Sequence, residues 1–393
     1  MISVEDALTR IFALVSPVGT ETVGLADAHR RVLRKPVVAT RNQPPFAASS
    51  MDGYAVCDPV RPSQRMQVIG EAAAGHAFEG VITLGQALRI FTGAPMPIGA
   101  NRVIIQEDVI RDGDVITVRD SLDGARYIRD EGIDFKAGFT LDAPRRLTPS
   151  DLALIAAMNI AELSVSKRPT VAIISSGDEL VMPGETPRPD QIIASNVFAL
   201  KALAEQEGAS ARILPIASDT EDSLHAVLAL AEGADLVITI GGASVGDHDL
   251  VGPVLEKRGA KRSFYKVAMR PGKPLMAGTL AGSLVLGLPG NPVSAIVCGH
   301  VFMRPALRAL QGLAAAPMIT NVAKVTVDLP ANGPRAHYMR AMLGAGPTIT
   351  PLPNQDSSLL RLLTTAQALM IRPPHDRPRK AGEQMQYISL ETC

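Results

Sequence analysis

Apolar residues recur at helical spacing near the start of the chain, and a second apolar run follows a helix-start signal near residue 148, so the first half of the chain is predicted to contain two helices. The first helix follows Ser3, a suitable cap with Asp6 three residues later. The second follows Thr148, where Pro149 suits a first helical turn. Between the two helices, short β-branched segments predict strands at 66–70, 87–91, 102–110 and 114–118.

These patterns predict a multi-domain α/β protein. We expect a discontinuous helical domain, residues 1–44 and 140–167, that encloses an inserted β-rich module, residues 45–139. Residues 168–317 alternate continuous apolar strands with helices, which indicates an αβ domain with a parallel sheet buried on both faces. Residues 318–393 return to short alternating strands, which predict a small β-barrel or sandwich.

The balance of charges excludes some classes of partner. Lysine plus arginine and aspartate plus glutamate each number 39, so there is no basic excess for nucleic acid or an anionic membrane. Residues 284–302 are the most apolar stretch, but prolines and polar residues interrupt them, which does not suit a bilayer span. The first residues lack a signal-peptide pattern, and the scattered Cys57, Cys298 and Cys393 indicate free thiols. We expect a cytoplasmic protein that binds neither nucleic acid nor membrane.

Parallel αβ sheets bind ligands beyond the carboxyl ends of their strands, here the loops after Ile174, Ile240, Met269 and Leu288. In the first loop, Ser176 and Gly177 precede Asp178 and Glu179. Two carboxylates at such a place suit a hard cation such as Mg²⁺, and a solvated turn is the alternative.

The second loop, GGASVGDHD, brings glycines close to acids. Gly241, Gly242 and Ser244 suit an anion held by backbone amides, and Asp249 follows them. A tight structural turn would explain the same glycines.

The remaining two loops carry cations and a helix start. Arg270 and Lys273 flank a Pro-Gly turn and suit phosphates, although the sequence is not a P-loop and a solvated basic turn is the alternative. Pro289, Gly290 and Asn291 precede a helix whose free amides suit an anion, while simple helix capping explains most of the pattern.

In the inserted module, the candidate polar residues are Asp52, Thr92, Arg129 and Asp134. Charged loops of this kind are often only solvated surface. The chain has no HExxH, GxGxxG or GxSxG, so a zinc hydrolase, a Rossmann oxidoreductase and a serine esterase lack support.

Taken together and in order, seven segments resemble the molybdopterin molybdenumtransferase (MoeA) family. They lie between about residues 44 and 294 and read PPFAASSMDGYAV, FTGAPMPIGANRVIIQED, YIRDEGIDFKAG, SSGDELV, GGASVGDHD, KVAMRPGKP and LGLPGNPVSA. The resemblance implies an elongated homodimer of four-domain subunits, with a molybdopterin-binding-like αβ domain and a C-terminal β-barrel. It also implies insertion of molybdenum from molybdate into adenylylated molybdopterin, with release of AMP and a need for Mg²⁺. The adenylylating enzyme and molybdoenzyme acceptors are the implied further partners.

The resemblance also assigns roles to residues of this chain. It implies a metal site at Glu179, Asp219 and Asp249, and catalytic roles for Asp52, Glu179, Asp249, Arg270 and Lys273. The implied substrate-binding residues are Thr92, Arg129, Asp134, Ser176, Gly177, Gly241, Gly242, Ser244, Pro289, Gly290 and Asn291. Those of the inserted module would come from the other subunit and close the cleft.

The chain departs from the family pattern at several positions. Ala47 and Ala48 stand where Asp-Asn is usual, Arg270 where Lys is usual, and Ala194 where a polar residue is usual. In the barrel, NQDSSLLRLL replaces a more glycine-rich segment. Two alternative functions are a non-catalytic molybdopterin-binding or regulatory paralogue and a molybdopterin adenylyltransferase. The acids of the cleft argue against the first, and the inserted module and barrel argue against the second.

Overall fold

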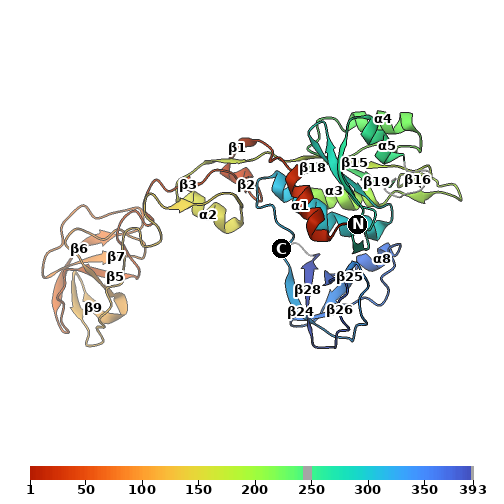
Figure 1. Cartoon of the computed structure of the whole chain (residues 1–393). Coiled ribbons are helices and arrows are strands. Elements are labelled where there is room, and N and C mark those ends of the chain that lie inside the picture. Colours follow the sequence, from red (N-terminus) through yellow and green to blue (C-terminus); the bar gives the residue numbers. More distant parts are fainter. Residues whose placement is uncertain (242–249, 391–393) are drawn as a thin grey trace.

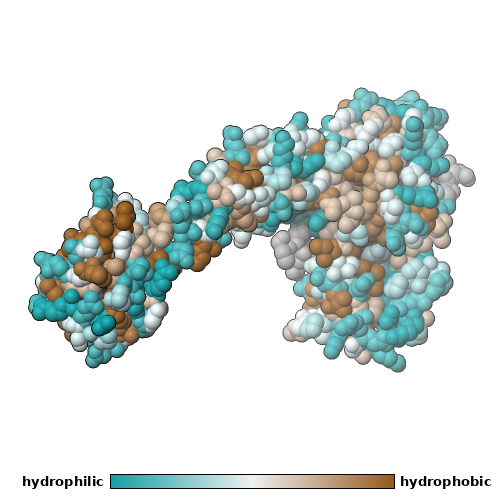
Figure 2. Space-filling model, turned by 60° about the vertical axis from the view of Figure 1, so that its left-hand side comes forward, coloured by the Kyte–Doolittle hydropathy of each residue, from teal (hydrophilic) through white to brown (hydrophobic). Residues whose placement is uncertain are grey.

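The structure is a computed structural model, and it describes residues 1–241 and 250–390. The molecule is elongated (Figure 1), with the inserted module at one end and the αβ domain and the barrel at the other. The space-filling view shows the connecting arm as a narrow bridge (Figure 2). Within one chain, the inserted module therefore lies away from the αβ domain.

The αβ domain has a six-stranded sheet of order β18-β15-β19-β23-β22-β20. The first four strands are parallel, β22 is antiparallel to β23, and β20 is antiparallel to β22. Their bounds are β15 Thr170–Ser175, β18 Ser210–Ile213, β19 Leu236–Ile240, β20 Lys261–Tyr265, β22 Met276–Leu280 and β23 Ser283–Leu288. The parallel strands confirm the sequence prediction, whereas the antiparallel β22 was not predicted.

Helices cover both faces of this sheet, as its apolar strands require. One face packs on α1, α3 and the long helix that starts at Pro292, and the other packs on α4 and α5. The bounds are α1 Val4–Leu14, α3 Asn196–Gln206, α4 Glu221–Leu230, α5 Val251–Lys257, α6 Pro292–Cys298, the π-helical turn Gly299–Met303 and α7 Arg304–Leu310. Pro292–Leu310 is long and apolar enough to cross a membrane, but 94% of its apolar window is buried, as in the core helix of a globular domain.

The first helix corrects the expected helical domain. The predicted cap is confirmed, because Ser3 and Asp6 form a capping box at the start of α1. However, Ala7, Leu8 and Ile11 pack into the αβ core instead of against the second predicted helix. An amphipathic pattern shows that one face of a helix is buried, but it does not show which domain buries it.

The flanking segments form the arm and are built mostly of strands rather than helices. Its antiparallel sheet has the order β1-β14-β2-β13, and α2 packs beside it with a capping box between Thr148 and Asp151. The bounds are β1 Thr20–Gly24, the 3₁₀ turn Leu25–Asp27, β2 Val32–Leu33, β13 Arg145–Arg146, α2 Pro149–Ala157 and β14 Glu162–Ser166. The pair β3 Val37–Val38 and β12 Thr140–Leu141 leads to the inserted module.

The inserted module is a six-stranded sheet of order β8-β5-β7-β6-β10-β9, with the pair β4–β11 beside it. The bounds are β4 Ala48–Ser49, β5 Gly53–Val56, β6 Arg65–Ala72, β7 Gln86–Ile90, β8 Arg102–Ile105, the 3₁₀ turn Gln106–Asp108, β9 Val109–Asp112, β10 Val115–Val118 and β11 Ile128–Arg129. The segment 102–110, predicted as one strand, is divided by the 3₁₀ turn.

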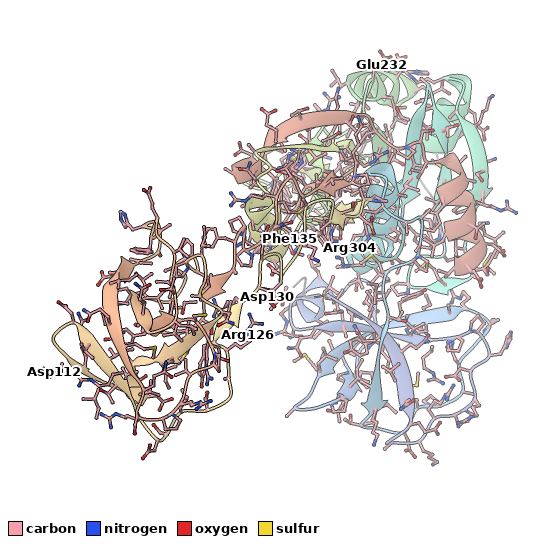
Figure 3. All side chains as sticks on the ribbon, turned by 90° about the vertical axis from the view of Figure 1, so that its left-hand side faces the viewer. Asp112, Arg126, Asp130, Phe135, Glu232 and Arg304 are labelled. Atoms are coloured by element: carbon pink, nitrogen blue, oxygen red, sulfur yellow. The ribbon has the colours of Figure 1, made fainter. Side chains whose placement is uncertain are left out.

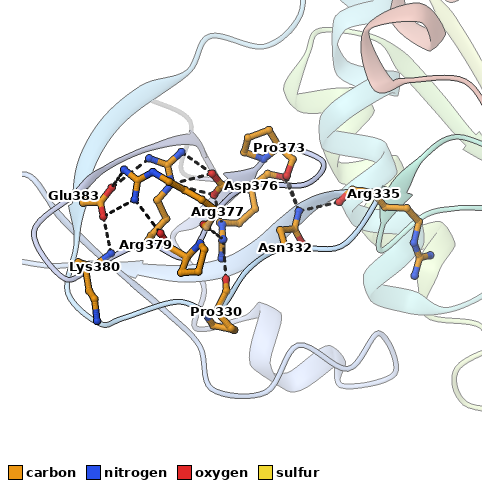
Figure 4. Close-up of polar contacts among 11 residues, drawn as sticks. Pro330, Asn332, Arg335, Pro373, Asp376, Arg377, Arg379, Lys380 and Glu383 are labelled. Atoms are coloured by element: carbon orange, nitrogen blue, oxygen red, sulfur yellow. Dashed lines mark hydrogen bonds and ion pairs between the residues drawn. The ribbon is translucent and has the colours of Figure 1, made fainter.

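The C-terminal domain is a closed barrel of five strands. Its order is β25-β26-β24-β28-β27, and β27 pairs with β25 to close the ring. The bounds are β24 Asn321–Val325, β25 Ala336–Leu343, β26 Thr348–Pro351, α8 Leu360–Leu363, β27 Ala368–Arg372 and β28 Gln384–Ser389. The buried carboxylate of Asp376 accepts bonds from Arg372 and Arg379, each at 2.6 Å, and so ties the end of β27 to the next turn (Figure 4).

One expected loop belongs to a different sheet. The loop after Met269 was expected at the carboxyl edge of the αβ sheet, but Met269–Arg270 forms the short strand β21, which pairs with β25 of the barrel. Arg270 therefore lies at the junction of the αβ domain and the barrel.

Candidate functional site

A cleft of about 480 Å³ opens at the carboxyl edge of the parallel strands. Its walls come from the ends of β15, β19 and β23 and from the ribbon formed by β16 (Leu180–Val181) and β17 (Ile192–Ile193). Of the sequence candidates, the cleft is lined by Ser176, Glu179, Gly241, Pro289, Gly290 and Asn291. The cleft lies where ligands of parallel αβ sheets bind.

Backbone hydrogen bonds lock the loops at the floor of the cleft together. The N–H of Ser176 donates to the carbonyl of Ile240 at 3.1 Å, and the N–H of Gly241 donates to the carbonyl of Leu288 at 3.3 Å. Gly241 has a φ of 89°, and a Cβ there would lie 2.8 Å from the carbonyl oxygen of Ser176. Only glycine fits this close approach, so the floor is preformed backbone.

The acids in and beside the cleft differ in how many hydrogen bonds they already accept. Asp178 Oδ1 accepts from the N–H of Asp219 at 3.1 Å, and Asp219 Oδ2 accepts from the N–H of Asp178 at 3.5 Å. Glu179 is exposed and lines the cleft. Asp249, Gly242 and Ser244 lie outside the described residues. Across residues 1–241 and 250–390, no three potential metal-ligating side chains gather closely enough to hold an ion.

A loop of the barrel reaches the rim of the cleft. The side-chain amide of Asn291 donates to Ser357 Oγ at 3.1 Å, and the N–H of Val293 donates to the Ser357 carbonyl at 3.2 Å. The buried Arg340 holds this loop, because it donates to the carbonyls of Asn354, Asp356 and Leu359 at 2.9 to 3.2 Å. The segment NQDSS thus contacts the cleft rim, which the sequence left undecided.

The two predicted cations lie beside the cleft rather than in its walls. Lys273 is exposed and precedes Pro274, which lines the cleft, and Arg270 is exposed on β21. Arg270 pairs in register with the buried His337. Burial lowers the pKa of His337 to about 4, and the charges of Arg270 and three further arginines act in the same direction. This junction is therefore positively charged while His337 itself is neutral at pH 7.

In the inserted module, the structure joins Asp52 directly to Thr92. Asp52 Oδ1 accepts from the backbone N–H of Thr92 at 2.8 Å and from its hydroxyl at 2.9 Å. These two bonds, and to a smaller extent the charge of Arg89, lower the pKa of Asp52. Asp52 is therefore ionised at neutral pH.

The other two module candidates lie on different local elements. Arg129 is on β11, which pairs with β4 just before the Asp52 loop. Asp134 lies in the turn that joins the module to the arm, where Figure 3 labels Asp130 and Phe135 on either side of it in sequence. Its N–H donates to the carbonyl of Gln43 at 3.0 Å.

Most of the candidates that lie within the described residues fall into two separate groups. Ser176, Gly177, Glu179, Asp219, Gly241 and 289–291 gather at the αβ cleft, and Asp52, Thr92, Arg129 and Asp134 lie on the module or its neck. The arm separates the two groups within one chain (Figure 1).

Comparison with known proteins finds three family profiles that match successive segments of the chain. The sequence profile described as "MoeA N-terminal region (domain I and II)" matches residues 2–159, "Probable molybdopterin binding domain" matches 172–309, and "MoeA C-terminal region (domain IV)" matches 322–390. A molybdopterin molybdenumtransferase of Nostoc sp. is 38% identical over 80% of this chain and 76% of its own length. The chain belongs to the MoeA family.

Further MoeA relatives cover nearly the whole chain. A protein of Mycobacterium tuberculosis named molybdopterin molybdenumtransferase 2 is 36% identical over 94% of this chain and 95% of its own length. A crystal structure of a molybdopterin biosynthesis MoeA protein from Pyrococcus horikoshii covers 100% of both chains at 27% identity, with a TM-score of 0.83. The similarity therefore extends over all four parts of the fold.

Several residues beside the two groups of candidates were not predicted from the sequence. The guanidinium of Arg89 lies 4.6 Å from the ring centre of Phe91 and 5.2 Å from that of Tyr54, and it donates to the carbonyl of Gly53 at 3.2 Å. Asn196 donates to the carbonyl of Gly290 at 2.7 Å and so holds the turn before α6. The sequence could have pointed to Arg89, because it lies within an apolar strand next to FTGAP. A charged group in such a strand needs a place where its charge is satisfied.

Replacing Thr92 should shift the pH dependence of a MoeA reaction in a known direction. Thr92→Val removes the hydroxyl bond to Asp52 but keeps the backbone bond, so the pKa of Asp52 should rise towards its usual value. The ionised carboxylate is then lost at a higher pH, and the acid limb of kcat/KM should move upward. At pH 7 Asp52 stays ionised in both proteins, and we expect a loss of about twofold to tenfold because one of the two hydrogen bonds that position its carboxylate is missing.

The matched control is Thr83→Val, because the Thr83 hydroxyl donates to Gln86 at 2.8 Å on the same module. This control should leave the acid limb in place. An unchanged acid limb in Thr92→Val as well would show that Asp52 does not control it.

Proposed function

We propose that this chain is a molybdopterin molybdenumtransferase of molybdenum cofactor biosynthesis. It inserts molybdenum from molybdate into adenylylated molybdopterin and releases AMP. The single observation that carries the proposal is the polar cleft at the carboxyl edge of the αβ sheet, in the segment that matches the molybdopterin-binding profile. The activity itself is inferred from the relatives, which match this chain over most of its length.

The chemistry of the cleft suits a substrate with several negative charges. The backbone at Gly241 and at Gly290–Asn291 is fixed by hydrogen bonds and faces the cleft, as binding of phosphate oxygens requires. Arg270 and Lys273 add positive charge beside it. Such a site accelerates the release of AMP by stabilising charge at phosphorus rather than by supplying a nucleophile.

Mg²⁺ fits the available donors. Among the described residues, no hydrogen bond engages the Glu179 carboxylate, and one oxygen of Asp219 stays available beyond its bond to the N–H of Asp178. Mg²⁺ is commonly bound by one or two carboxylates together with substrate phosphates. Glu179 and Asp219 would hold it, together with Asp249, and the ion would neutralise charge on the phosphates.

The module candidates act in a homodimer. Since the arm holds Asp52, Thr92, Arg129 and Asp134 away from the cleft of their own chain, we propose that they close the cleft of the partner subunit. An arrangement across a twofold axis would form two equivalent sites. The reaction would take place in the cytoplasm, where an adenylylating enzyme would supply the substrate and molybdoenzymes would accept the product.

The alternatives lack a favouring observation. A non-catalytic binding protein would not need an ionised Asp52 held by two hydrogen bonds or a free Glu179 in the cleft. An adenylyltransferase would need only the αβ domain, whereas this chain carries the arm, module and barrel as well.

The proposal is tested by incubating the purified chain with adenylylated molybdopterin, molybdate and Mg²⁺. We expect release of AMP and formation of a cofactor that activates an apo-molybdoenzyme. Omitting molybdate or adding a chelator should stop formation of the active cofactor. If neither AMP nor active cofactor appears under complete conditions, the proposed activity is wrong.

A further inference from the structure

The ribbon beside Glu179 is a fixed part of the cleft wall. Its two strands are parallel, with Leu180 opposite Ile192 and Val181 opposite Ile193. The N–H of Ile192 donates to the carbonyl of Glu179 at 2.7 Å, and the N–H of Ala194 donates to that of Val181 at 2.9 Å. The ribbon therefore holds its side chains in a set position next to the acid.

This ribbon exposes apolar side chains where the cleft opens. Ile192 is 60% exposed and Ile193 is 40% exposed, and both line the cleft together with Leu180. Exposing two isoleucines forfeits the stabilisation that their burial would give. The lining of the cleft also includes the polar side chains of Ser175, Ser176 and Asn291. The cleft thus offers apolar side chains on the ribbon and polar groups elsewhere in its lining.

We propose that the ribbon formed by Leu180–Val181 and Ile192–Ile193 receives one face of a planar heterocycle of the substrate. The inference rests on the proposed function, whose substrate contains two such rings, the adenine base and the pterin. A flat ring presents an apolar face and a polar edge, and it gains by covering exposed aliphatic side chains. The cleft volume of about 480 Å³ lies in the usual range for ligand pockets and leaves room for phosphates beside the ring.

The test measures binding to the full-length chain by calorimetry with three probes. AMP carries a base, ribose 5-phosphate is the same nucleotide without a base, and 6-hydroxymethylpterin is a pterin without phosphate. Ile192→Ser and Ile193→Ser should each weaken binding of AMP or of the pterin about fivefold to tenfold. Binding of ribose 5-phosphate should not change. A loss confined to AMP identifies the base as the ring on the ribbon, and a loss confined to the pterin identifies the pterin.

The matched control is Ile110→Ser, because Ile110 is 55% exposed on β9 of the inserted module. It should leave all three affinities unchanged. A second measurement uses Ile192→Trp, since the chain contains no tryptophan. Its fluorescence should be quenched by AMP or the pterin at concentrations that match the calorimetric affinity, and ribose 5-phosphate should have no effect.

The outcomes separate this inference from the proposed function. If the wild-type chain releases AMP but both serine variants bind AMP and the pterin as tightly as it does, the ribbon does not receive a ring and the function stands. If the serine variants lose ring binding but the wild-type chain never releases AMP, the function is wrong and the ring site stands. Equal weakening for all three probes, including ribose 5-phosphate, would overturn the inference.

Discussion

A random mixture of Asp52→Ala and Glu179→Ala subunits should regain about one quarter of the wild-type activity, because a twofold dimer has two sites and a mixed dimer keeps one of them intact. Random mixing makes half of the dimers mixed. In a mixed dimer, one site receives both defects and the other receives the intact module of one chain and the intact cleft of its partner. Each variant alone should lose about a hundredfold or more in kcat, as expected when a charged group that contacts the reacting atoms is removed.

The reason for this expectation is the shape of the chain. Glu179 lines the cleft at the αβ sheet, whereas Asp52 lies on the module at the far side of the arm. If each site used the module and the cleft of one chain, no combination of these two variants would contain an intact site. Rescue therefore reports specifically on a site built from two subunits.

The experiment needs a pair of variants that cannot rescue each other. Asp52→Ala mixed with Asp134→Ala is such a control, because both changes lie on the module side and each site of the mixed dimer contains one of them. The measurement is the rate of AMP release after the variants are unfolded, mixed and refolded together, or co-expressed with different tags. Absence of rescue in the Asp52–Glu179 mixture, with heterodimers present, would contradict the shared site.

Local chemistry made much of the fold predictable. The capping residues Ser3 and Thr148 mark the starts of α1 and α2, because the signal lies within four residues of the chain. The continuous apolar strands β15, β19 and β23 indicated a buried parallel sheet and therefore the edge where a cleft would open. Gly241 was part of this prediction. Its turn has a positive φ and approaches the carbonyl of Ser176 too closely for any side chain.

Contacts between distant segments were not predictable in the same way. The core position of α1 depends on contacts with β20 and β22, which begin at Lys261 and Met276, far away in the sequence. Likewise, Ser357 meets Asn291 across two domains, and Met269–Arg270 joins the barrel sheet. A single sequence shows which residues must be buried or bonded, but it does not show which distant partner they find.

The second large effect is expected at Glu207, which joins the arm to the αβ domain. Glu207 is 3% exposed, and its carboxylate accepts from Arg304 Nε at 2.8 Å and from an Arg146 terminal nitrogen at 2.9 Å. Arg304 is also buried, and Figure 3 labels it where the arm meets the αβ domain. Gln311 completes the joint by donating to the Glu207 carbonyl at 2.7 Å.

Glu207→Ala should lower the free energy of unfolding by about 3–5 kcal/mol, because it leaves a buried arginine without its counter-charge. Burial already lowers the pKa of Arg146, and the charge of Glu207 opposes that change. Without Glu207, Arg146 loses the ion pair that holds it against the αβ domain. The arm should therefore also move more freely. Urea unfolding followed by circular dichroism measures the first effect, and amide hydrogen exchange in β2 and β13 measures the second.

Glu205→Ala, two residues earlier and within α3, provides the matched control. Glu205 is exposed and, among the described residues, its one ion pair is with Lys201 at the surface, so its loss should cost about 0.5 kcal/mol or less. Glu207→Gln keeps one acceptor for the arginines and should lie between the two. If Glu205→Ala and Glu207→Ala shifted the transition equally, the ion pairs at the joint would not fix the arm, and its position would depend on the apolar contacts of the αβ core alone.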